Sequence, residues 1–257
     1  MVIKMALNDK IGEVMRAFSS SKHHHTTAII VAAGSGNRMN SNVTKQMLNL
    51  CGIPVVIRSL LPFEESEYID EIIIVARENE ISLYPDLLEK YDIEKVTKII
   101  AGGETRQESV LKGFCEISDE TDFVAIHDGA RPLITTEQIK KVVLAGFDRR
   151  SATAGVKSKD TVKLSALGDF VDRTLDRDKA WIIQTPQVFY ADLYRAAISV
   201  SEKDNFKATD DCSIVEHAGF TVKLVDCGYS NIKITSPEDL IFAEAIIKSR
   251  EDSKKDE

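Results

Sequence analysis

The sequence lacks any long run of apolar residues. Its longest apolar stretches, such as residues 72–76, are far shorter than the roughly 20 residues that a membrane-spanning helix needs, which excludes an integral membrane protein. Basic blocks are also absent, and the 257 residues carry 33 Lys and Arg against 41 Asp and Glu, a formal net charge of -8. Because nucleic-acid binders owe most of their affinity to neutralised phosphates, this balance argues against a nucleic-acid partner. It leaves room for a small anionic substrate, which needs only a few cations placed locally.

Cysteine and histidine are scarce as well. The four cysteines, Cys51, Cys115, Cys212 and Cys227, are far apart and form no C-x-x-C pair, so neither a zinc site nor a redox motif is indicated. We expect buried or half-buried free thiols and, from them, a reducing, cytoplasmic location. Three of the five histidines form the run 23–25, so chemistry built on several histidines is not expected.

The two ends of the chain differ from the rest. Residues 1–25 are polar and charged and end in the histidine run, so we predict a disordered N-terminal appendage. A secretory signal peptide is disfavoured because no apolar core is followed by a cleavage site. A transit peptide, and with it a plastid stroma, is the alternative that Asp9 and Glu13 disfavour. Residues 251–257 are expected to be a disordered tail, which leaves 26–250 as one domain.

Within that domain, short apolar runs alternate with longer amphipathic segments. Strands are predicted at 28–31, 72–76, 96–100 and 123–126, and helices at 54–64, 81–91, 104–117 and 136–147. Strands without polar alternation indicate a sheet covered on both faces, and the strand-helix rhythm indicates parallel βαβ units. A last helix is expected from the capping residue Ser236 to about Lys248. The fold class is therefore α/β, with a doubly wound, mostly parallel, Rossmann-like sheet.

One polar stretch interrupts this rhythm. From about 157 to 184, polar residues alternate around Gly168 and Asp169, which are suited to a hairpin turn. We predict a protruding β-hairpin arm. An exposed hairpin needs a surface to lie on, and a second subunit is the obvious candidate, so the arm predicts a homodimer.

Two glycine clusters follow predicted strands. In A-A-G-S-G-N-R-M, Gly34 and Gly36 can present backbone N–H groups to a nucleotide, with Arg38 and Lys45 to neutralise its phosphates. This cluster matches neither the dinucleotide fingerprint nor the P-loop, and a tight turn beside two surface cations is the alternative. In G-G-E-T-R-Q-E-S-V, Ser109 can donate to and accept from a base edge, and simple helix capping is the alternative.

A third cluster, H-D-G-A-R-P, ends the fourth predicted strand. A carboxylate such as Asp128 beside a triphosphate suits Mg²⁺, which binds few carboxylates together with phosphate oxygens. A turn-forming aspartate is the alternative for Asp128, and His127 is assigned to packing or hydrogen bonding. Arg177 and Lys233 stand in two later segments, and each by itself is equally compatible with a surface position.

As a set, these motifs resemble the 2-C-methyl-D-erythritol 4-phosphate cytidylyltransferase family. The resemblance runs from about residue 27 to 250 and rests on A-A-G-S-G-N-R-M, K-Q-M-L, G-G-E-T-R-Q-E-S-V, H-D-G-A-R-P, D-T-V-K, Q-T-P-Q-V-F, T-D-D and N-I-K-I-T-S-P-E-D-L. It implies transfer of a cytidylyl group from CTP to 2-C-methyl-D-erythritol 4-phosphate, with Mg²⁺ as cofactor and pyrophosphate as second product. The reaction belongs to the non-mevalonate route to isoprenoids.

The resemblance also implies a role for individual residues. The implied catalytic cations are Arg38, Lys45, Arg177 and Lys233. The implied contacts of the nucleotide are Ala32, Ala33, Gly34, Gly36, Gly103, Glu104, Ser109 and Asp128. The implied contacts of the polyol phosphate are Asp128, Arg131, Thr161, Lys163, Arg177, Thr209 and Lys233. Because the family's arm embraces a partner subunit, Thr161 and Lys163 are candidates for the neighbour's site.

Two positions depart from the family pattern, and two other functions compete. Thr44 stands where proline is usual and Gly129 where alanine is commoner, but neither change removes a charge. A ribitol 5-phosphate cytidylyltransferase shares the fold and the nucleotide loop, and Arg177, Trp181 and the D-T-V-K arm favour the methylerythritol enzyme instead. A non-catalytic, nucleotide-binding regulatory module would lack the cations, and all four are present.

Overall fold

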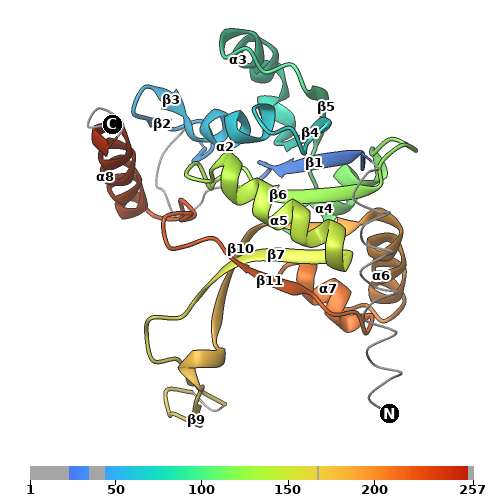
Figure 1. Ribbon diagram of the computed structural model, residues 1–257, viewed down its shortest axis with the longest axis vertical. Helices are drawn as coiled ribbons and strands as arrows, with labels where there is room; N and C mark the ends of the chain where they lie inside the picture. The colour runs from blue at the N-terminus through green and yellow to red at the C-terminus, as the bar shows by residue number, and fades with distance from the viewer. Residues whose placement is uncertain (1–22, 35–43, 167, 254–257) are drawn as a thin grey trace, which may run out of the picture.

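A seven-stranded sheet forms the centre of the protein in the computed structural model, which describes residues 23–34, 44–166 and 168–253. The strand order is β11-β7-β10-β6-β1-β4-β5 (Figure 1). The strands are β1 (Thr26–Val31), β4 (Glu71–Ala76), β5 (Val96–Ala101), β6 (Phe123–Asp128), β7 (Ser151–Lys157), β10 (Trp181–Tyr190) and β11 (Lys223–Asp226). β10 alone in this sheet runs antiparallel to both neighbours. The prediction of a mostly parallel α/β sheet is confirmed.

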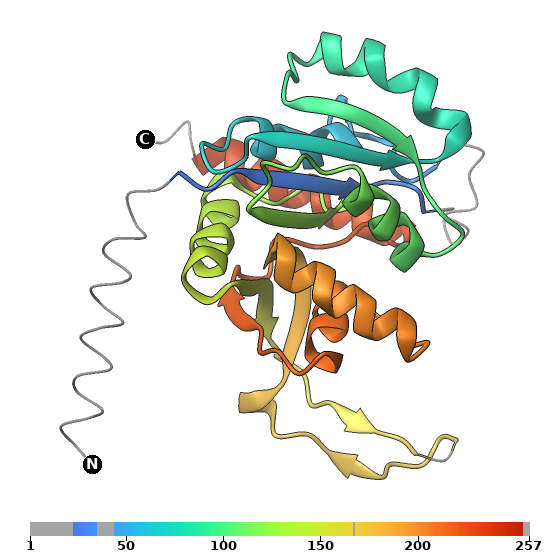
Figure 2. The ribbon, with the colours of Figure 1, turned by 90° about the vertical axis from the view of Figure 1, so that its right-hand side faces the viewer.

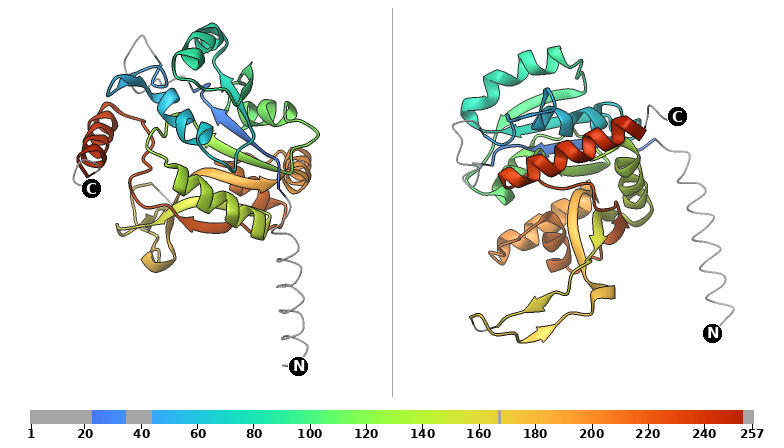
Figure 3. Two further views of the ribbon diagram at one scale, coloured as in Figure 1. Left: turned by 45° about the horizontal axis from the view of Figure 1, so that its top comes forward. Right: turned by 90° about the vertical axis from the view of Figure 1, so that its left-hand side faces the viewer.

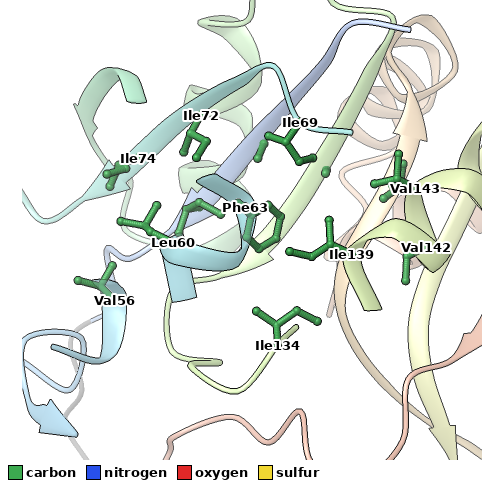
Figure 4. Close-up of a cluster of buried hydrophobic side chains, with 14 of the residues drawn as sticks. Val56, Leu60, Phe63, Ile69, Ile72, Ile74, Ile134, Ile139, Val142 and Val143 are labelled. Atoms are coloured by element: carbon green, nitrogen blue, oxygen red, sulfur yellow. The ribbon is translucent and has the colours of Figure 1, made fainter. Parts of the chain in front are cut away.

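Helices cover both faces of this sheet, and alternate residues of each strand pack against them. On one face, Ile30 and Ile74 join side chains of α2 (Val55–Glu64) and α5 (Thr136–Arg149). Figure 4 shows Ile74 in this cluster with Leu60 of α2 and Ile139 of α5. On the other, Ile29 and Val75 meet α4 (Arg106–Cys115), α6 (Ala191–Lys203) and α7 (Asp211–His217). Every residue of β4 and β6 is buried, as strands between two helical layers must be.

The remaining elements lie at the periphery. The predicted helix over 81–91 begins as a 3-10 helix, η2 (Glu78–Leu83), and becomes α3 (Tyr84–Lys90) where Pro85 suits the first turn. The helix α8 (Pro237–Ser253) packs Ala243 and Ile247 against Leu50 of the β2–β3 hairpin, β2 (Asn49–Leu50) and β3 (Ile53–Pro54). Figure 3 shows α8 set apart from the other helices. None of the helices over the described residues is long and apolar enough to cross a bilayer.

The arm is present as a hairpin. β8 (Lys163–Leu164) pairs antiparallel with β9 (Arg173–Thr174), and Gly168 takes the positive φ of 59° that such a turn needs. Figure 2 shows this hairpin projecting from the sheet, and Phe170 near its tip is 82% exposed. A short 3-10 turn, η3 (Arg177–Lys179), leads back to the sheet. The homodimer inferred from the arm stays a prediction.

Two expectations about where elements end need correction. The arm ends earlier than residue 184, because Trp181 already pairs with Lys157 in the main sheet. The last helix continues past Lys248 to Ser253, whose hydroxyl donates to the Ser249 carbonyl, so the predicted tail overlaps it at 251–253. Residues 254–257 lie outside the described residues.

The appendage and the thiols also differ from expectation. Residues 1–22 lie outside the described residues, but His23 at the end of the predicted appendage contacts Asp70 at 2.7 Å. Cys51 and Cys115 are exposed, because one occupies the tight β2–β3 turn and the other ends α4. Cys212 and Cys227 are buried, as expected, and all four thiols are free.

Candidate active site

A cavity of about 760 Å³ opens beyond the carboxyl ends of four parallel strands. Val31 ends β1, Ala76 ends β4, Gly102 follows β5 and Asp128 ends β6, and all four residues line it. This edge of an open α/β sheet is where ligands bind, because the loops there diverge to the two helical layers. The predicted location of the site is therefore also where the structure has a cavity of substrate size.

The first glycine loop forms one wall of this cavity. Ala33, Gly34 and Lys45 line it, whereas Ala32 is wholly buried behind them. Gly36 and Arg38, two further predicted site residues, lie outside the described residues. Thr44, where the family usually has proline, begins the turn that contains Lys45, because its carbonyl accepts from the Met47 N–H at 3.0 Å.

The second glycine loop forms the opposite wall, with Gly102, Gly103 and Glu104. A Cβ on Gly102 would lie 2.3 Å from the Ala33 Cβ, so the two loops approach too closely for any side chain there. Ser109 braces the turn: its Oγ accepts from the Gly103 N–H at 3.0 Å and donates to the Thr105 carbonyl at 2.9 Å. The proton of Ser109 is thus already engaged, and one lone pair is left for a ligand.

Asp128 at the cavity floor is surrounded by cations. Its Oδ1 lies 3.1 Å from Arg106 Nε, and its Oδ2 lies 2.8 Å from Lys233 Nζ and 3.4 Å from Arg131 Nε. Burial alone would raise the pKa of Asp128, but Arg106, Lys233 and Arg131 hold it well below its usual range. The carboxylate is therefore ionised and keeps three cations gathered at the end of β6.

A neutral histidine supports this carboxylate from beneath. The Asp128 N–H donates to Thr185 Oγ1 at 3.1 Å, and Thr185 Oγ1 lies 3.0 Å from His127 Nδ1. His127 Nε2 lies 3.4 Å from the Arg131 carbonyl, so Nε2 carries the proton and Nδ1 accepts from Thr185. The assignment of His127 to packing and hydrogen bonding fits this chain of contacts.

Lys233 joins the main cavity to a second one of about 400 Å³ at the base of the arm. Arg131, Lys157 and Lys159 also line the second cavity, and Arg131 Nη1 donates to the Asn231 carbonyl at 2.9 Å. Asn231 is buried, and its Nδ2 donates to the Thr185 carbonyl at 2.9 Å. The loop that bears Lys233 is thereby attached to the strand that supports Asp128.

Besides the buried Ala32, four predicted site residues of the described part of the chain line neither cavity. Arg177, Thr161 and Lys163 are exposed on the arm, where Lys163 Nζ donates to Thr174 Oγ1 at 2.7 Å. Thr209 is exposed in the loop before α7. Gly129 does not line the main cavity either, because a Cβ there would face Ala32 at the end of β1.

Sequence reasoning missed several residues of the site, Arg106 above all. Arg106 lines the cavity and contacts both Asp128 and Asp211, the latter at 2.8 Å. An arginine opening the helix after a glycine pair is a signal that could have been used. No sequence pattern indicates Asp211 as its partner. The side wall at Arg77, Glu78 and Asn79, where β4 gives way to the first residues of η2, carries no recognisable motif.

The donor set limits how a metal could bind. Across the described residues, no three His, Cys, Asp or Glu side chains are placed to hold a metal ion. Both oxygens of Asp128 contact cations, so direct coordination by Asp128 would displace one of them. The site fits Mg²⁺ as an ion carried mainly by phosphate oxygens, which is how Mg²⁺ often binds in nucleotide enzymes.

Comparison with known proteins points to a single family. The family model for IspD, 2-C-methyl-D-erythritol 4-phosphate cytidylyltransferase, matches residues 26–249. The protein of that name from Geobacillus kaustophilus is 42% identical over 218 residues, 85% of this chain and 95% of its own length. Its namesake from Caldanaerobacter subterraneus is 43% identical over 217 residues, 84% of this chain and 96% of its own.

A solved structure agrees with the sequence comparisons. The crystal structure of 4-diphosphocytidyl-2C-methyl-D-erythritol synthase from Anaerococcus prevotii has a TM-score of 0.79 and 36% identity, and the match covers 88% of this chain and 97% of that one. The family model spans both glycine loops, Asp128 and Lys233, so the match includes the cavity and not only the sheet. The chain therefore belongs to the 2-C-methyl-D-erythritol 4-phosphate cytidylyltransferase family.

Proposed function

We propose that this protein transfers the cytidylyl group of CTP to 2-C-methyl-D-erythritol 4-phosphate. The observation that carries the proposal is a pair of cavities that share Lys233 in their linings. One is lined by the glycines of two loops, as a nucleotide requires, and by Asp128, which contacts Lys233, and the other is lined by cations. Family membership supplies the identity of the two substrates.

The chemistry needs positioning more than it needs a protein nucleophile. A substrate phosphate oxygen forms a bond to the α-phosphorus of CTP, and the bond from that phosphorus to the bridging oxygen breaks and releases pyrophosphate. A phosphate monoester is already largely dianionic near pH 7, so no base has to activate it. Two anions must nevertheless approach each other, and charge grows on the leaving group. Cations fixed around the α-phosphoryl group would lower that barrier.

Individual residues take roles that follow from their positions. Lys45, at the wall formed by the first glycine loop, would stabilise the charge on the transferred phosphoryl group. Arg38 lies outside the described residues, and the family resemblance gives it the same role. Lys233, between the cavities, would hold the attacking phosphate, with Asp128 fixing the ammonium at 2.8 Å. Ala33, Gly34, Gly103, Glu104 and Ser109 would frame the nucleotide.

The second cavity would be completed by a second subunit. Arg177, Thr161, Lys163 and Thr209 lie away from both cavities of their own chain. The arm that carries the first three projects from the sheet, so it can reach a neighbouring molecule (Figure 2). A homodimer in which each arm contributes to the other subunit's polyol phosphate site would use the three arm residues Arg177, Thr161 and Lys163.

The proposal also includes Mg²⁺ as the cofactor of the transfer and the cytoplasm as the location of the protein. When bound, Mg²⁺ would neutralise charge on the triphosphate, and the phosphate oxygens would hold it with Asp128 nearby. Within the chain, Lys45 and Lys233 bind and orient the phosphates whether or not the ion contacts Asp128 directly.

A substrate panel tests the proposal. Purified protein with CTP and Mg²⁺ should release pyrophosphate when 2-C-methyl-D-erythritol 4-phosphate is added. Ribitol 5-phosphate should give no release, and ATP or GTP in place of CTP should give little, because the family to which the chain belongs transfers a cytidylyl group. Release with ribitol 5-phosphate alone would assign the protein to that substrate, and no release with any pair would indicate a non-catalytic nucleotide-binding module.

A further inference from the structure

Arg106 is held in one conformation by the turn that precedes it. It is the first residue of α4, and the Thr105 side chain caps that helix by accepting from the Glu108 N–H at 3.1 Å. The turn itself is closed by the bond from Gly103 N–H to Ser109. From this position, directly after the second glycine loop, the side chain of Arg106 lines the main cavity.

The guanidinium of Arg106 joins two carboxylates from different parts of the fold. Its Nε lies 3.1 Å from Asp128 Oδ1 at the end of β6, and its Nη1 lies 2.8 Å from Asp211 Oδ2 at the start of α7. The side chain of Arg106 is 28% exposed, against 8% for Asp128 and 1% for Asp211. The rigid, planar fork of arginine suits such a two-sided contact, which lysine could not make.

Asp211 is connected to the cavity through its ion pair with Arg106. It does not line the main cavity, and its Oδ1 accepts from the Tyr194 hydroxyl at 2.9 Å while its N–H donates to Gln187 Oε1 at 3.0 Å. Asp211 is thus fixed on α7 from two sides. Its remaining oxygen determines where Nη1 of Arg106 lies, and therefore where Nε points.

The neighbouring Gln107 reinforces this connection. Its Oε1 accepts from the Ala208 N–H at 3.2 Å, and its Nε2 donates to the Phe206 carbonyl at 3.5 Å. The first turn of α4 therefore contacts both ends of the 206–211 segment, which includes Thr209. One helix start thus connects the nucleotide loop, the Thr209 loop and the carboxylate of Asp128.

We propose that Arg106 is a positioning residue for the transfer reaction, anchored by Asp211, and that it holds Asp128 so that Lys233 meets the attacking phosphate. With Oδ1 fixed by Arg106, Oδ2 is left for Lys233 at 2.8 Å and Arg131 at 3.4 Å. Without Arg106, Oδ1 would lose its partner, the carboxylate could rotate, and Lys233 would lose its fixed partner. The inference rests on the proposed cytidylyl transfer and concerns how its site is held in place.

Asp211→Asn is the sharpest test, because it keeps the side-chain volume and touches neither cavity. We expect kcat to fall and the KM for 2-C-methyl-D-erythritol 4-phosphate to rise, so that their ratio drops by about tenfold, as loss of a charged hydrogen-bond partner typically costs. The KM for CTP should stay the same. A purely structural role would instead lower the unfolding temperature without this selective change.

The double variant Arg106→Gln/Asp211→Asn removes both charges, so no buried carboxylate is left unpaired. We expect it to fold and to lose on the order of 100-fold in kcat/KM for the polyol phosphate, as misplaced groups do in other enzymes. The matched control is Arg195→Gln/Asp192→Asn, which removes an exposed Arg–Asp pair of α6 and should leave kcat/KM unchanged.

The outcomes separate the two proposals. If the wild type is active and both Asp211→Asn and the double variant keep its kcat/KM, the role of Arg106 is overturned and the proposed function stands. A wild type that is inactive with 2-C-methyl-D-erythritol 4-phosphate would overturn the proposed function, and the role of Arg106 with it.

Discussion

Acid should destabilise this protein through one buried side chain, that of His127. His127 is 0% exposed, and its ring packs on Phe63 with centroids 4.9 Å apart. The ring is hydrogen-bonded to the Thr185 hydroxyl and to the Arg131 carbonyl. Burial lowers the pKa of His127 from 6.5 to about 3, although the nearby Asp128 carboxylate acts in the opposite direction. The folded protein therefore keeps this imidazole neutral at pH values where the unfolded chain protonates it.

The sign and size of the effect follow from that difference. Between about pH 3 and 6.5 the unfolded chain binds one more proton at this residue, so the free energy of unfolding rises with pH. The contribution of the neutral His127 to stability is fully present above pH 6.5, the pKa of this residue in the unfolded chain. It is lost as the pH falls toward about 3, the pKa in the folded protein. Each pH unit between these two values changes the free energy of unfolding by about 1.36 kcal/mol. At pH 5, roughly 1.5 units below the pKa in the unfolded chain, the free energy of unfolding is therefore lower by about 2 kcal/mol.

His127→Asn provides the test, because an amide can still accept from Thr185 but cannot titrate. The variant should be less stable than wild type at pH 7, since it loses the contact with Phe63 and the bond to Arg131. Its change in free energy of unfolding between pH 7 and pH 5 should be smaller than that of wild type by about 2 kcal/mol. Urea unfolding at both pH values, followed by circular dichroism, measures this difference. An equal pH dependence in the two proteins would refute the reasoning from burial.

Three further predictions concern the site. Lys45→Ala should lower turnover by orders of magnitude with an unchanged circular dichroism spectrum, and near-normal kcat would contradict its role. Asp128→Asn leaves three cations without their shared carboxylate and should lower the free energy of unfolding by about 3 kcal/mol in urea at pH 7. Because the pKa of Asp128 is depressed in the folded state, that difference should persist down to about pH 4; no loss at pH 7 would argue against the cation cluster. Gly102→Ala would place a methyl 2.3 Å from Ala33 Cβ and 2.8 Å from Ser109 Oγ. Calorimetry should show weaker CTP binding, and unaltered affinity would mean that the two glycine loops can separate without cost.

The sheet and its covering helices could be predicted because their signal is local. Apolar runs such as the one in β4 have no polar alternation, and this pattern directly reports burial on both faces. The antiparallel β10 was not predicted, because its first four residues, 181–184, were assigned to the arm. Pairing of Trp181 with Lys157 is a tertiary contact, and no local pattern distinguishes a strand that enters the sheet from one that leaves it.

The residues of the site that directly follow strands could be predicted from motifs. The residues that reach the site from distant elements could not. Strand ends converge at one sheet edge in any doubly wound domain, so Gly34, Gly103 and Asp128 could be expected to meet. The position of Arg177 depends on an arm that points away from its own chain. Asp211 comes to Arg106 through the packing of α7 beside α4, which depends on the whole helical layer and not on a motif.

The carboxylate at the centre of a phosphate site also needs a physical explanation, which composition could not supply. Arg106, Arg131 and Lys233 all lie within 3.4 Å of Asp128, and without it they would repel one another in a partly buried place. Asp128 and Asp211 offset two of the three charges, so the cluster stays assembled and still has a net positive charge for an incoming anion. A chain with a net charge of -8 can therefore bind two phosphorylated substrates, because the carboxylates fix the cations in place and leave one positive charge uncompensated.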